Sequence, residues 1–386
     1  MKKKITIFGS TGSIGISTLD IINDYPEKYE IVGLTADKNY EKLLEQVARF
    51  NPRIVLINNN DSYKKFKDLN NNKNLKVLNG NSSYSEVFEY KTDMVVAAIT
   101  GSTGLMPVVK AAEKGITIAL ANKESLVCSG SLINSIAKDN GSKILPVDSE
   151  HNAIYQVLDF KNKSKISKLI LTASGGPFLK KRVEDLNSIT PAEAIKHPNW
   201  SMGKKISVDS ATMMNKGLEL IEAHYLFNMP QEKIDVIIHP ESIIHSCVEY
   251  SDGSILSQMG MPDMRTPISY VLAYPERIKT SVKRLKLSEI KTLTFYEPDL
   301  NKFPCLGLAY ESLRLKKNAP TILNAANEVA VDAFLTEKIK YLSIPLIVEK
   351  TLNKASIFDI NSIKDVIDFD VDARIIANEL INTGKY

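Results

Sequence analysis

Short apolar runs recur along the first part of the chain, with helical or polar stretches between them. The runs that predict buried strands lie at residues 4–8, 30–36, 53–57, 76–78, 94–99, 117–120 and 143–145. Strands that alternate with helices are typical of a parallel, doubly wound sheet. We therefore expect an α/β fold whose N-terminal domain, residues 1–147, is built on a Rossmann-like parallel sheet.

The pattern changes after residue 147. Strands are predicted at residues 168–172, 234–238, 246–250 and 254–259, and a helix is predicted from near Met213 to Leu226. Asp252 and Gly253 form a hairpin signal between the last two strands, which either flank a site or form a dimerisation edge. We expect a central α/β catalytic domain with a mixed sheet at residues 148–278, a linker at residues 279–300 and a C-terminal helical domain at residues 301–386.

Length and composition limit the class of protein. A chain of 386 residues exceeds the usual size of one hydrophobic core, and 44% hydrophobic with 24% charged residues is typical of a globular protein. The 49 basic and 45 acidic residues give a net charge of +4, too small an excess for a nucleic-acid-binding surface. The three distant cysteines predict neither a disulfide framework nor a thiolate metal site. The sequence has no apolar signal region and no apolar window of about 18 to 20 residues, so we expect a cytoplasmic protein without a membrane partner.

The sequence GSTGSIG at residues 9–15 joins the first predicted strand to a helical pattern. Here glycines let the backbone approach a pyrophosphate, and the helix offers N–H groups and the positive end of its dipole. The alternative is a glycine turn that serves packing alone. The second strand ends at Asp37, Lys38 and Asn39, where a dinucleotide-binding fold reads the ribose. An acid there favours a 2′-hydroxyl and a base favours a 2′-phosphate, so the choice between NAD and NADP stays open on these residues.

Asp148 and Glu150 follow the apolar run at residues 143–145. On a continuing strand their side chains would share one face, and paired carboxylates suit Mg²⁺ or Mn²⁺, which prefer oxygen ligands. The alternative is an ordinary acidic helix start. On the helix that begins near Met213, Asn215 and Lys216 lie on the same face as Glu219, a candidate third ligand. The alternative there is a solvated ion pair.

Three further segments carry candidate chemistry. ANKES at residues 121–125 lies at the carboxyl edge of the predicted sheet, where it either serves cofactor and substrate or merely opens a helix. SGGPF at residues 174–178 offers backbone amides and a hydroxyl to an anion such as phosphate. HPNWSMG at residues 197–203 holds the only tryptophan, and we favour a lid over a core plug. The histidines at positions 151, 224, 239 and 245 lack zinc-site spacing, and we interpret them as structural.

Six blocks taken together closely resemble the 1-deoxy-D-xylulose 5-phosphate reductoisomerase family, over essentially the whole chain. They are GSTGSIG, ANKES, PVDSEHNAI at residues 146–154, SGGPF, HPNWSMG and DSATMMNKGLE at residues 209–219. The resemblance implies a homodimer that uses NADPH and Mg²⁺ or Mn²⁺ to convert 1-deoxy-D-xylulose 5-phosphate to 2-C-methyl-D-erythritol 4-phosphate. It also implies that a skeletal rearrangement precedes hydride reduction of an aldehyde, in the methylerythritol phosphate route to isoprenoids.

The same resemblance implies a role for each residue at a motif position. The metal ligands would be Asp148, Glu150 and Glu219, which with Lys123 would be the catalytic residues. The substrate would contact Lys123, Ser149, Glu150, Ser174, His197, Trp200, Met202, Ser210, Asn215, Lys216 and Glu219. NADPH would contact Thr11, Gly12, Ser13, Ile14, Asp37, Lys38, Asn39, Asn122, Glu124 and Gly203. Asp37 departs from the glycine common at its position in the family, and this departure concerns the 2′-phosphate contacts rather than the reaction.

Two rival interpretations remain on the residues alone. A metal-independent NAD(P) dehydrogenase with the same nucleotide domain would ignore chelators. A nucleotide-sensing or scaffold protein would bind NADPH and turn nothing over. Three acids, two candidate anion sites and a candidate lid argue against the second of these.

Overall fold

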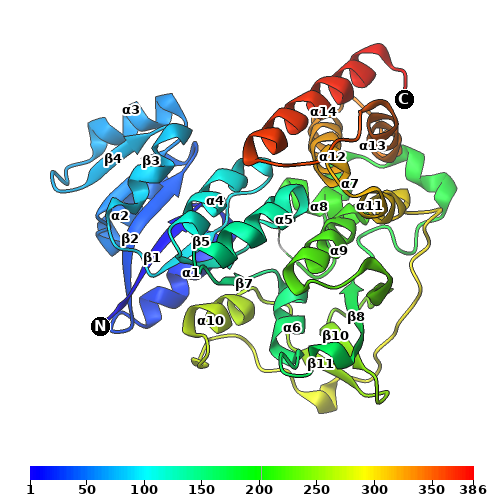
Figure 1. Ribbon diagram of the computed structural model, residues 1–386, viewed down its shortest axis with the longest axis horizontal. Helices are drawn as coiled ribbons and strands as arrows, with labels where there is room; N and C mark the ends of the chain where they lie inside the picture. The colour runs from blue at the N-terminus through cyan, green and yellow to red at the C-terminus, as the bar shows by residue number, and fades with distance from the viewer. Residues whose placement is uncertain (201) are drawn as a thin grey trace. The chain divides into compact units, whose positions relative to one another are not determined.

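A computed structural model describes residues 1–200 and 202–386 of the chain, apart from the side chains of residues 81 and 82 (Figure 1). The chain forms two compact units, each assembled from three segments. Unit 1 comprises residues 1–125, 133–148 and 264–282, and unit 2 comprises residues 126–132, 149–263 and 283–386. The domain boundaries expected from the sequence stay predictions.

Unit 1 is built on a parallel sheet of seven strands in the order β4-β3-β2-β1-β5-β6-β7. The strands are β1 (Lys3–Phe8), β2 (Tyr29–Ala36), β3 (Ile54–Ile57), β4 (Lys76–Asn79), β5 (Met94–Ala97), β6 (Thr117–Leu120) and β7 (Ile144–Pro146). Strands covered on both faces read as continuous apolar runs, and all four residues of β3 are fully buried. The parallel sheet predicted from the alternating pattern is confirmed.

The helices of unit 1 connect the strands and include one helix from far along the chain. They are α1 (Ser13–Asp24), α2 (Tyr40–Phe50), α3 (Asn60–Leu69), α4 (Leu105–Glu113), α5 (Lys123–Asp139) and α10 (Arg265–Ala273), with 3-10 turns η1 (Asn81–Glu89) and η2 (Ser102–Gly104). Residues 126–132 of α5 belong to unit 2. α10 packs against α1 and contacts β6 and β7. Lys3 Nζ donates to the Leu272 carbonyl oxygen at 2.7 Å, which ties α10 to the start of β1.

Unit 2 contains a mixed sheet of four strands in the order β11-β10-β8-β9. The strands are β8 (Ile166–Ala173), β9 (Ile234–Ile238), β10 (Ile244–Tyr250) and β11 (Ile255–Met259). β8 and β9 are parallel, whereas β10 is antiparallel to both β8 and β11. The mixed sheet predicted for this region is confirmed. β11 is an edge strand, and its Ile255 and Leu256 side chains are 55% and 48% exposed.

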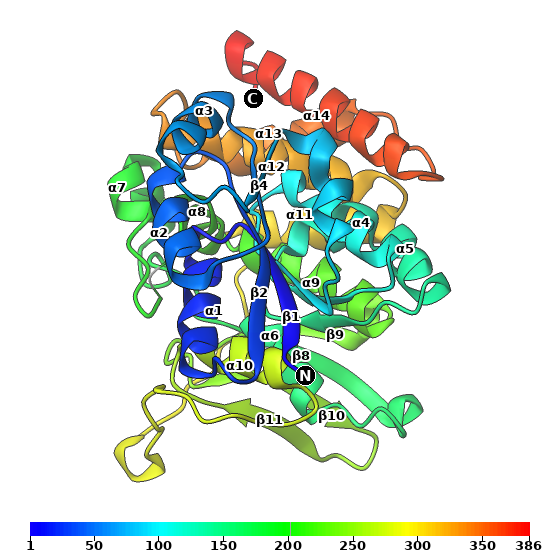
Figure 2. The ribbon, with the colours of Figure 1, turned by 90° about the vertical axis from the view of Figure 1, so that its left-hand side faces the viewer.

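The helices of unit 2 surround a large apolar core. They are α6 (Ser149–Val157), α7 (Pro191–Ala194), α8 (Lys204–Ala211), α9 (Met214–Phe227), α11 (Pro304–Leu315), α12 (Ala319–Leu335), α13 (Ser343–Lys354) and α14 (Ile363–Thr383), with 3-10 turns η3 (Lys163–Lys165), η4 (Val183–Ser188), η5 (Gln231–Lys233) and η6 (Leu287–Glu289). α12 is central to the C-terminal helices, and α14 lies against it in both views (Figure 2). Within the described ranges, no helix has both the length and the apolar content needed to cross a membrane.

Arg374 fastens α14 to α12. Its guanidinium donates to Glu328 Oε2 and to Asp370 Oδ2, each at 2.6 Å, and the three side chains are only 29%, 17% and 15% exposed. Loss of the arginine would leave two carboxylates without their shared partner in a poorly solvated position. We therefore expect Arg374→Ala to lower the free energy of unfolding by about 2 kcal/mol, measured by denaturant unfolding.

Arg314→Ala is the matched control. Arg314 pairs with Glu311 on the surface of α11, where the two side chains are 68% and 44% exposed. The control should change the free energy of unfolding by less than about 0.5 kcal/mol. Equal effects of the two substitutions would contradict the role assigned to Arg374.

Candidate active site

In the glycine turn after β1, some residues pack against neighbouring backbone and others are exposed to solvent. Gly9 has φ of +82°, and a Cβ there would lie 2.7 Å from the Ala98 carbonyl oxygen. A Cβ on Gly15 would lie 2.5 Å from the Gly9 carbonyl oxygen. Both positions therefore need glycine because a side chain would collide with the backbone, and Gly9 also needs it for its positive φ. Gly12 and Ser13, in contrast, are exposed where α1 begins, and the backbone N–H groups of a helix start suit an anion.

The turn is braced by buried hydrogen bonds from the neighbouring strand and helix. Ser10 Oγ donates to Gln46 Oε1 at 2.7 Å, and Gln46 Nε2 donates back to the Ser10 carbonyl oxygen at 2.8 Å. Thr35 Oγ1 accepts from the Gly9 N–H at 2.9 Å. These bonds fix the backbone of the turn, so an approaching phosphate would meet a preformed cradle.

Asp37, Lys38 and Asn39 are all exposed after the carboxyl end of β2. Asn39 caps α2, because its Oδ1 accepts from the Lys42 N–H at 3.1 Å. The amide is thus part of the local fold, and Asp37 and Lys38 follow the strand end where the sequence predicts that the ribose binds.

Asn122 is a structural crosslink at the start of α5. Its side chain is 1% exposed, and its Nδ2 donates to the carbonyl oxygens of Ile99 and Gly101 at 2.8 and 2.9 Å and to Glu124 Oε2 at 3.0 Å. Its Oδ1 accepts from the Ser125 N–H and caps the helix. These bonds fix Asn122 as the N-cap of α5 and Glu124 in the first turn of that helix, just after β6.

The acids at positions 148 and 150 come together in a different way from the one predicted. β7 ends at Pro146 and α6 begins at Ser149, so the prediction that a strand carries Asp148 and Glu150 is wrong. The first turn of α6 nevertheless brings them close: carboxylate oxygens of Asp148, Glu150 and Glu219 lie within 4.8 Å of one another. Asp148 is the last residue of its unit, and the peptide bond to Ser149 places it beside α6.

Two lysines compensate the charge of these carboxylates. Lys123 Nζ lies 2.8 Å from Asp148 Oδ2, and Lys216 Nζ lies 3.0 Å from Glu150 Oε1 and also binds Glu219. Asn215 Nδ2 donates to the second oxygen of Glu219. The prediction that Asn215, Lys216 and Glu219 share one helix face is therefore confirmed. The cluster combines carboxylate oxygens for a hard cation with ammonium groups for an anion.

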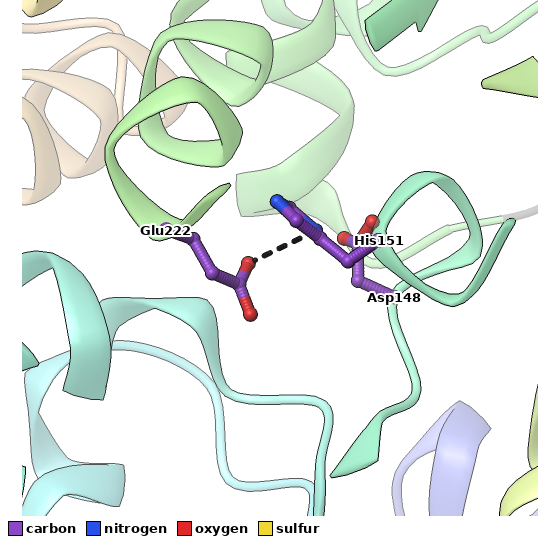
Figure 3. Close-up of side chains that lie close together, drawn as sticks. All are labelled: Asp148, His151 and Glu222. Atoms are coloured by element: carbon purple, nitrogen blue, oxygen red, sulfur yellow. Dashed lines mark ion pairs between the residues drawn. The ribbon is translucent and has the colours of Figure 1, made fainter. Parts of the chain in front are cut away.

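A buried pair next to this cluster was missed by the sequence reasoning. His151 on α6 is fully buried, its Nδ1 lies 3.3 Å from Glu222 Oε2, and its Nε2 lies 2.9 Å from the Glu219 carbonyl oxygen. Figure 3 shows Glu222 reaching from α9 toward the His151 ring, with Asp148 on the adjoining segment. Asp148, His151 and Glu222 form a second group with ligand atoms within 4.8 Å of one another. Two spacings carried a signal, since His151 follows Asp148 by three residues and Glu222 follows Glu219 by three.

Ser174 and His197 connect two of the sequence motifs. His197 Nδ1 accepts from the N–H groups of Asn199 and Trp200 at 3.1 and 3.0 Å. A nitrogen that accepts two hydrogen bonds carries no proton, so the ring is neutral and its Nε2–H donates to Ser174 Oγ at 2.9 Å. Burial lowers the pKa of His197 to about 4, which agrees with the neutral form.

The segment predicted as a lid is held at its base. Asn199 Nδ2 donates to the Pro240 carbonyl oxygen at 2.8 Å and to Ser242 Oγ at 2.9 Å. Trp200 is half-buried, with its ring centroid 6.2 Å from that of His245. Met202 is also half-buried, and Gly203 is exposed at the start of α8. Residue 201 lies outside the described residues, and the lid itself stays a prediction.

Comparison with known proteins decides the family. Residues 5–130 match 1-deoxy-D-xylulose 5-phosphate reductoisomerase, residues 144–227 match the C-terminal domain of the same family, and residues 259–376 match the DXP reductoisomerase C-terminal domain. The 1-deoxy-D-xylulose 5-phosphate reductoisomerase of Clostridium perfringens is 49% identical over 386 residues, covering 98% of this chain and 100% of that protein. The chain belongs to the 1-deoxy-D-xylulose 5-phosphate reductoisomerase family.

Solved structures of reductoisomerases share the whole fold. The enzyme from Zymomonas mobilis in complex with NADPH is 43% identical, with a TM-score of 0.93 and 99% of both chains covered. A DOX-P reductoisomerase in complex with NADPH, fosmidomycin and magnesium is 44% identical, with a TM-score of 0.94 and 99% of both chains covered. The resemblance stated from the six sequence blocks is therefore confirmed.

The protonation state of His197 can be tested by nuclear magnetic resonance of the ¹⁵N-labelled histidine rings. We expect a neutral ring with the proton on Nε2 and a titration midpoint about 2.5 pH units below the ordinary value of 6.5, because the pKa is lowered to about 4. The signal is assigned by its loss in His197→Asn. A midpoint near 6.5, or a proton on Nδ1, would contradict the assignment.

The same pKa shift predicts the direction of the pH effect on stability. Between pH 6.5 and about 4 the unfolded state binds a proton at His197 that the folded state does not. Protonation therefore favours unfolding, and the contribution of His197 to stability is lost as the pH falls through that range. The His197→Asn variant should show a shallower loss over the same range.

Proposed function

We propose that this protein converts 1-deoxy-D-xylulose 5-phosphate to 2-C-methyl-D-erythritol 4-phosphate, with NADPH and a divalent metal ion. The observation that carries the proposal is the convergence of Asp148, Glu150 and Glu219, within 4.8 Å of one another, in a member of this family. Neither a simple dehydrogenase nor a nucleotide sensor has a use for three carboxylates gathered in this way.

The carboxylate cluster fits a hard divalent cation. Asp148, Glu150 and Glu219 would hold Mg²⁺ or Mn²⁺, because anionic oxygens at this spacing repel one another until a cation lies between them. When bound, such an ion stabilises negative charge that develops on neighbouring substrate oxygens. Magnesium in a solved reductoisomerase structure supports this choice.

The glycine turn fits the pyrophosphate of a dinucleotide. Gly9 and Gly15 have no room for a side chain, and the exposed start of α1 offers N–H groups to an anion. NADPH in the Zymomonas mobilis structure supports this cofactor, which supplies a hydride. The residues proposed to contact it are Thr11, Gly12, Ser13, Ile14, Asp37, Lys38, Asn39, Asn122, Glu124 and Gly203.

The substrate phosphate would be bound in unit 2. The proposed contacts are Ser174, His197, Ser210, Asn215 and Lys216. Because neutral His197 donates its one N–H to Ser174 Oγ, it would orient that hydroxyl, whose own hydrogen can then be donated to the phosphate. The positive charge would come from Lys216. Trp200 and Met202 would exclude water from the reacting groups, with Lys123 and Ser149 near the reacting carbons.

Glu219→Gln tests the carboxylate site. We expect turnover of 1-deoxy-D-xylulose 5-phosphate, followed as NADPH absorbance, to fall by more than about 100-fold, because the variant loses one of the three anionic oxygen ligands proposed to hold the metal ion. NADPH binding, followed by fluorescence, should stay within about twofold, since the glycine turn is untouched. The control is Glu311→Gln, which removes a carboxylate of an exposed ion pair on α11.

Removal of the metal by a chelator distinguishes the proposed reductoisomerase from a metal-independent dehydrogenase and from a nucleotide sensor. A metal chelator should abolish turnover in the wild-type protein, and added Mg²⁺ or Mn²⁺ should restore it. Turnover that survives chelation would favour a metal-independent dehydrogenase, and NADPH binding without turnover under either metal would favour a sensor. Near-normal turnover in Glu219→Gln would overturn the three-carboxylate site.

We also propose that the protein is a cytoplasmic homodimer that pairs through β11. This edge strand exposes Ile255, Leu256 and Met259, and an apolar edge left open to water is a site for association. Leu256→Lys should shift the protein from dimer to monomer at micromolar concentration, measured by light scattering after size exclusion. Leu69→Lys on α3 is the control, because Leu69 is 57% exposed and lies in unit 1. A dimer that persists in Leu256→Lys would exclude this edge.

A further inference from the structure

Helix α8, which carries Ser210, is connected to the C-terminal helix α12 through the buried carboxylate of Asp209. Asp209 is 1% exposed, and its Oδ1 accepts from Asn327 Nδ2 at 2.8 Å. Lys205, one turn earlier on α8, lies 2.8 Å from Asp209 Oδ2. Asn327 is fully buried on α12, so the hydrogen bond connects two helices inside the core.

Tyr341 makes a second hydrogen bond that fixes the position of α8. Its hydroxyl, buried between α12 and α13, donates to the Ala211 carbonyl oxygen at 2.6 Å. The Tyr341 ring packs edge-on against Phe178, with centroids 5.4 Å apart, and against Phe334 of α12 at 6.0 Å. One side chain thus contacts both α8 and the SGGPF segment.

The SGGPF segment and α8 touch through their backbones. Gly176 has φ of +69°, and a Cβ there would lie 2.6 Å from the Ser210 carbonyl oxygen. Ser174 is two residues away, and its Oγ accepts from the Gly176 N–H at 3.1 Å. A displacement of α8 would therefore change the separation between the hydroxyls of Ser174 and Ser210.

We propose that Asn327 is a positioning residue for the phosphate end of the substrate, acting through Asp209 to set Ser210 against the Ser174 loop. An amide suits this role because the Asp209 carboxylate only accepts hydrogen bonds and Nδ2 donates. A leucine of similar size would leave one oxygen of a buried carboxylate without its donor, and an aspartate would add a second charge facing it. The inference rests on the proposed function.

The test compares the KM for 1-deoxy-D-xylulose 5-phosphate, the inhibition constant of inorganic phosphate and the KM for NADPH. In Asn327→Leu, the first two should rise about tenfold, because small misplacements of binding groups are costly. The KM for NADPH should stay within about twofold. A role confined to stability would lower the melting temperature without this selective change.

Asn324→Leu is the matched control. Asn324 is fully buried one turn earlier on α12, and its Nδ2 donates to Glu328 at 3.0 Å rather than to α8. It should lose stability without a selective loss of phosphate binding. Asn327→Asp should be worse than Asn327→Leu, and the double variant Asp209→Asn with Asn327→Asp should recover part of the phosphate affinity, because a donor again faces an acceptor.

Tyr341→Phe decides the question if Asn327→Leu fails to fold, because it removes only the hydroxyl that binds the Ala211 carbonyl oxygen. It should raise the same two constants in the same direction. The inference would be overturned if the wild-type protein turns over the substrate but no folded variant shows the selective rise in these two constants. It would also be overturned if Asn324→Leu raises them equally. Absence of wild-type turnover would instead overturn the proposed function.

Discussion

The constraint on which this structure depends is the approach of Asp148, Glu150 and Glu219 to within 4.8 Å. Like charges in poorly solvated positions repel one another strongly, so a fold that gathers them must compensate the charge and prevent their retreat. Lys123 and Lys216 supply the compensation through direct ion pairs. α9 prevents the retreat of Glu219, because the helix is buried around most of its circumference and its position is fixed by the core.

The residues that connect α8 to α9, and the start of α9 itself, are closely packed. Met213 adopts φ of +63° between α8 and α9, a conformation that a long side chain adopts only when its surroundings enforce it. The Met213 side chain is 2% exposed, so burial supports the turn. Gly217 has no side chain where α9 meets α11, since a Cβ would collide with Ala309. The C-terminal helices are therefore part of the support for the candidate site.

Sequence reasoning succeeded where the signal was local. The strands of both sheets were predicted within a few residues, because short apolar runs bounded by turn residues mark the buried strands and the Asp252–Gly253 hairpin signal marks the start of the exposed strand β11. It failed where the partner is distant in the chain. Helix α8 was missed because its buried Asp209 breaks the apolar period, and the donor that stabilises it is Asn327, 118 residues away. The acids at 148 and 150 were assigned to a strand because Val147 extends the apolar run beyond the end of β7.

The charge balance of the carboxylate cluster would connect the proposed metal site to substrate binding. Three carboxylates and the two lysines that pair with them carry a formal charge of −3 + 2 = −1, and Glu222 adds a further carboxylate next to Asp148, so this group would repel a phosphorylated ligand. A divalent cation at the proposed site would offset this negative charge, and the local field would oppose an anionic ligand less strongly. His197 does not alter this balance, since burial lowers its pKa to about 4 and keeps it neutral. With the metal at the proposed site, affinity for the phosphosugar would depend on the cation as well as on the residues proposed to contact the phosphate, so chelation should weaken substrate binding as well as the chemical step.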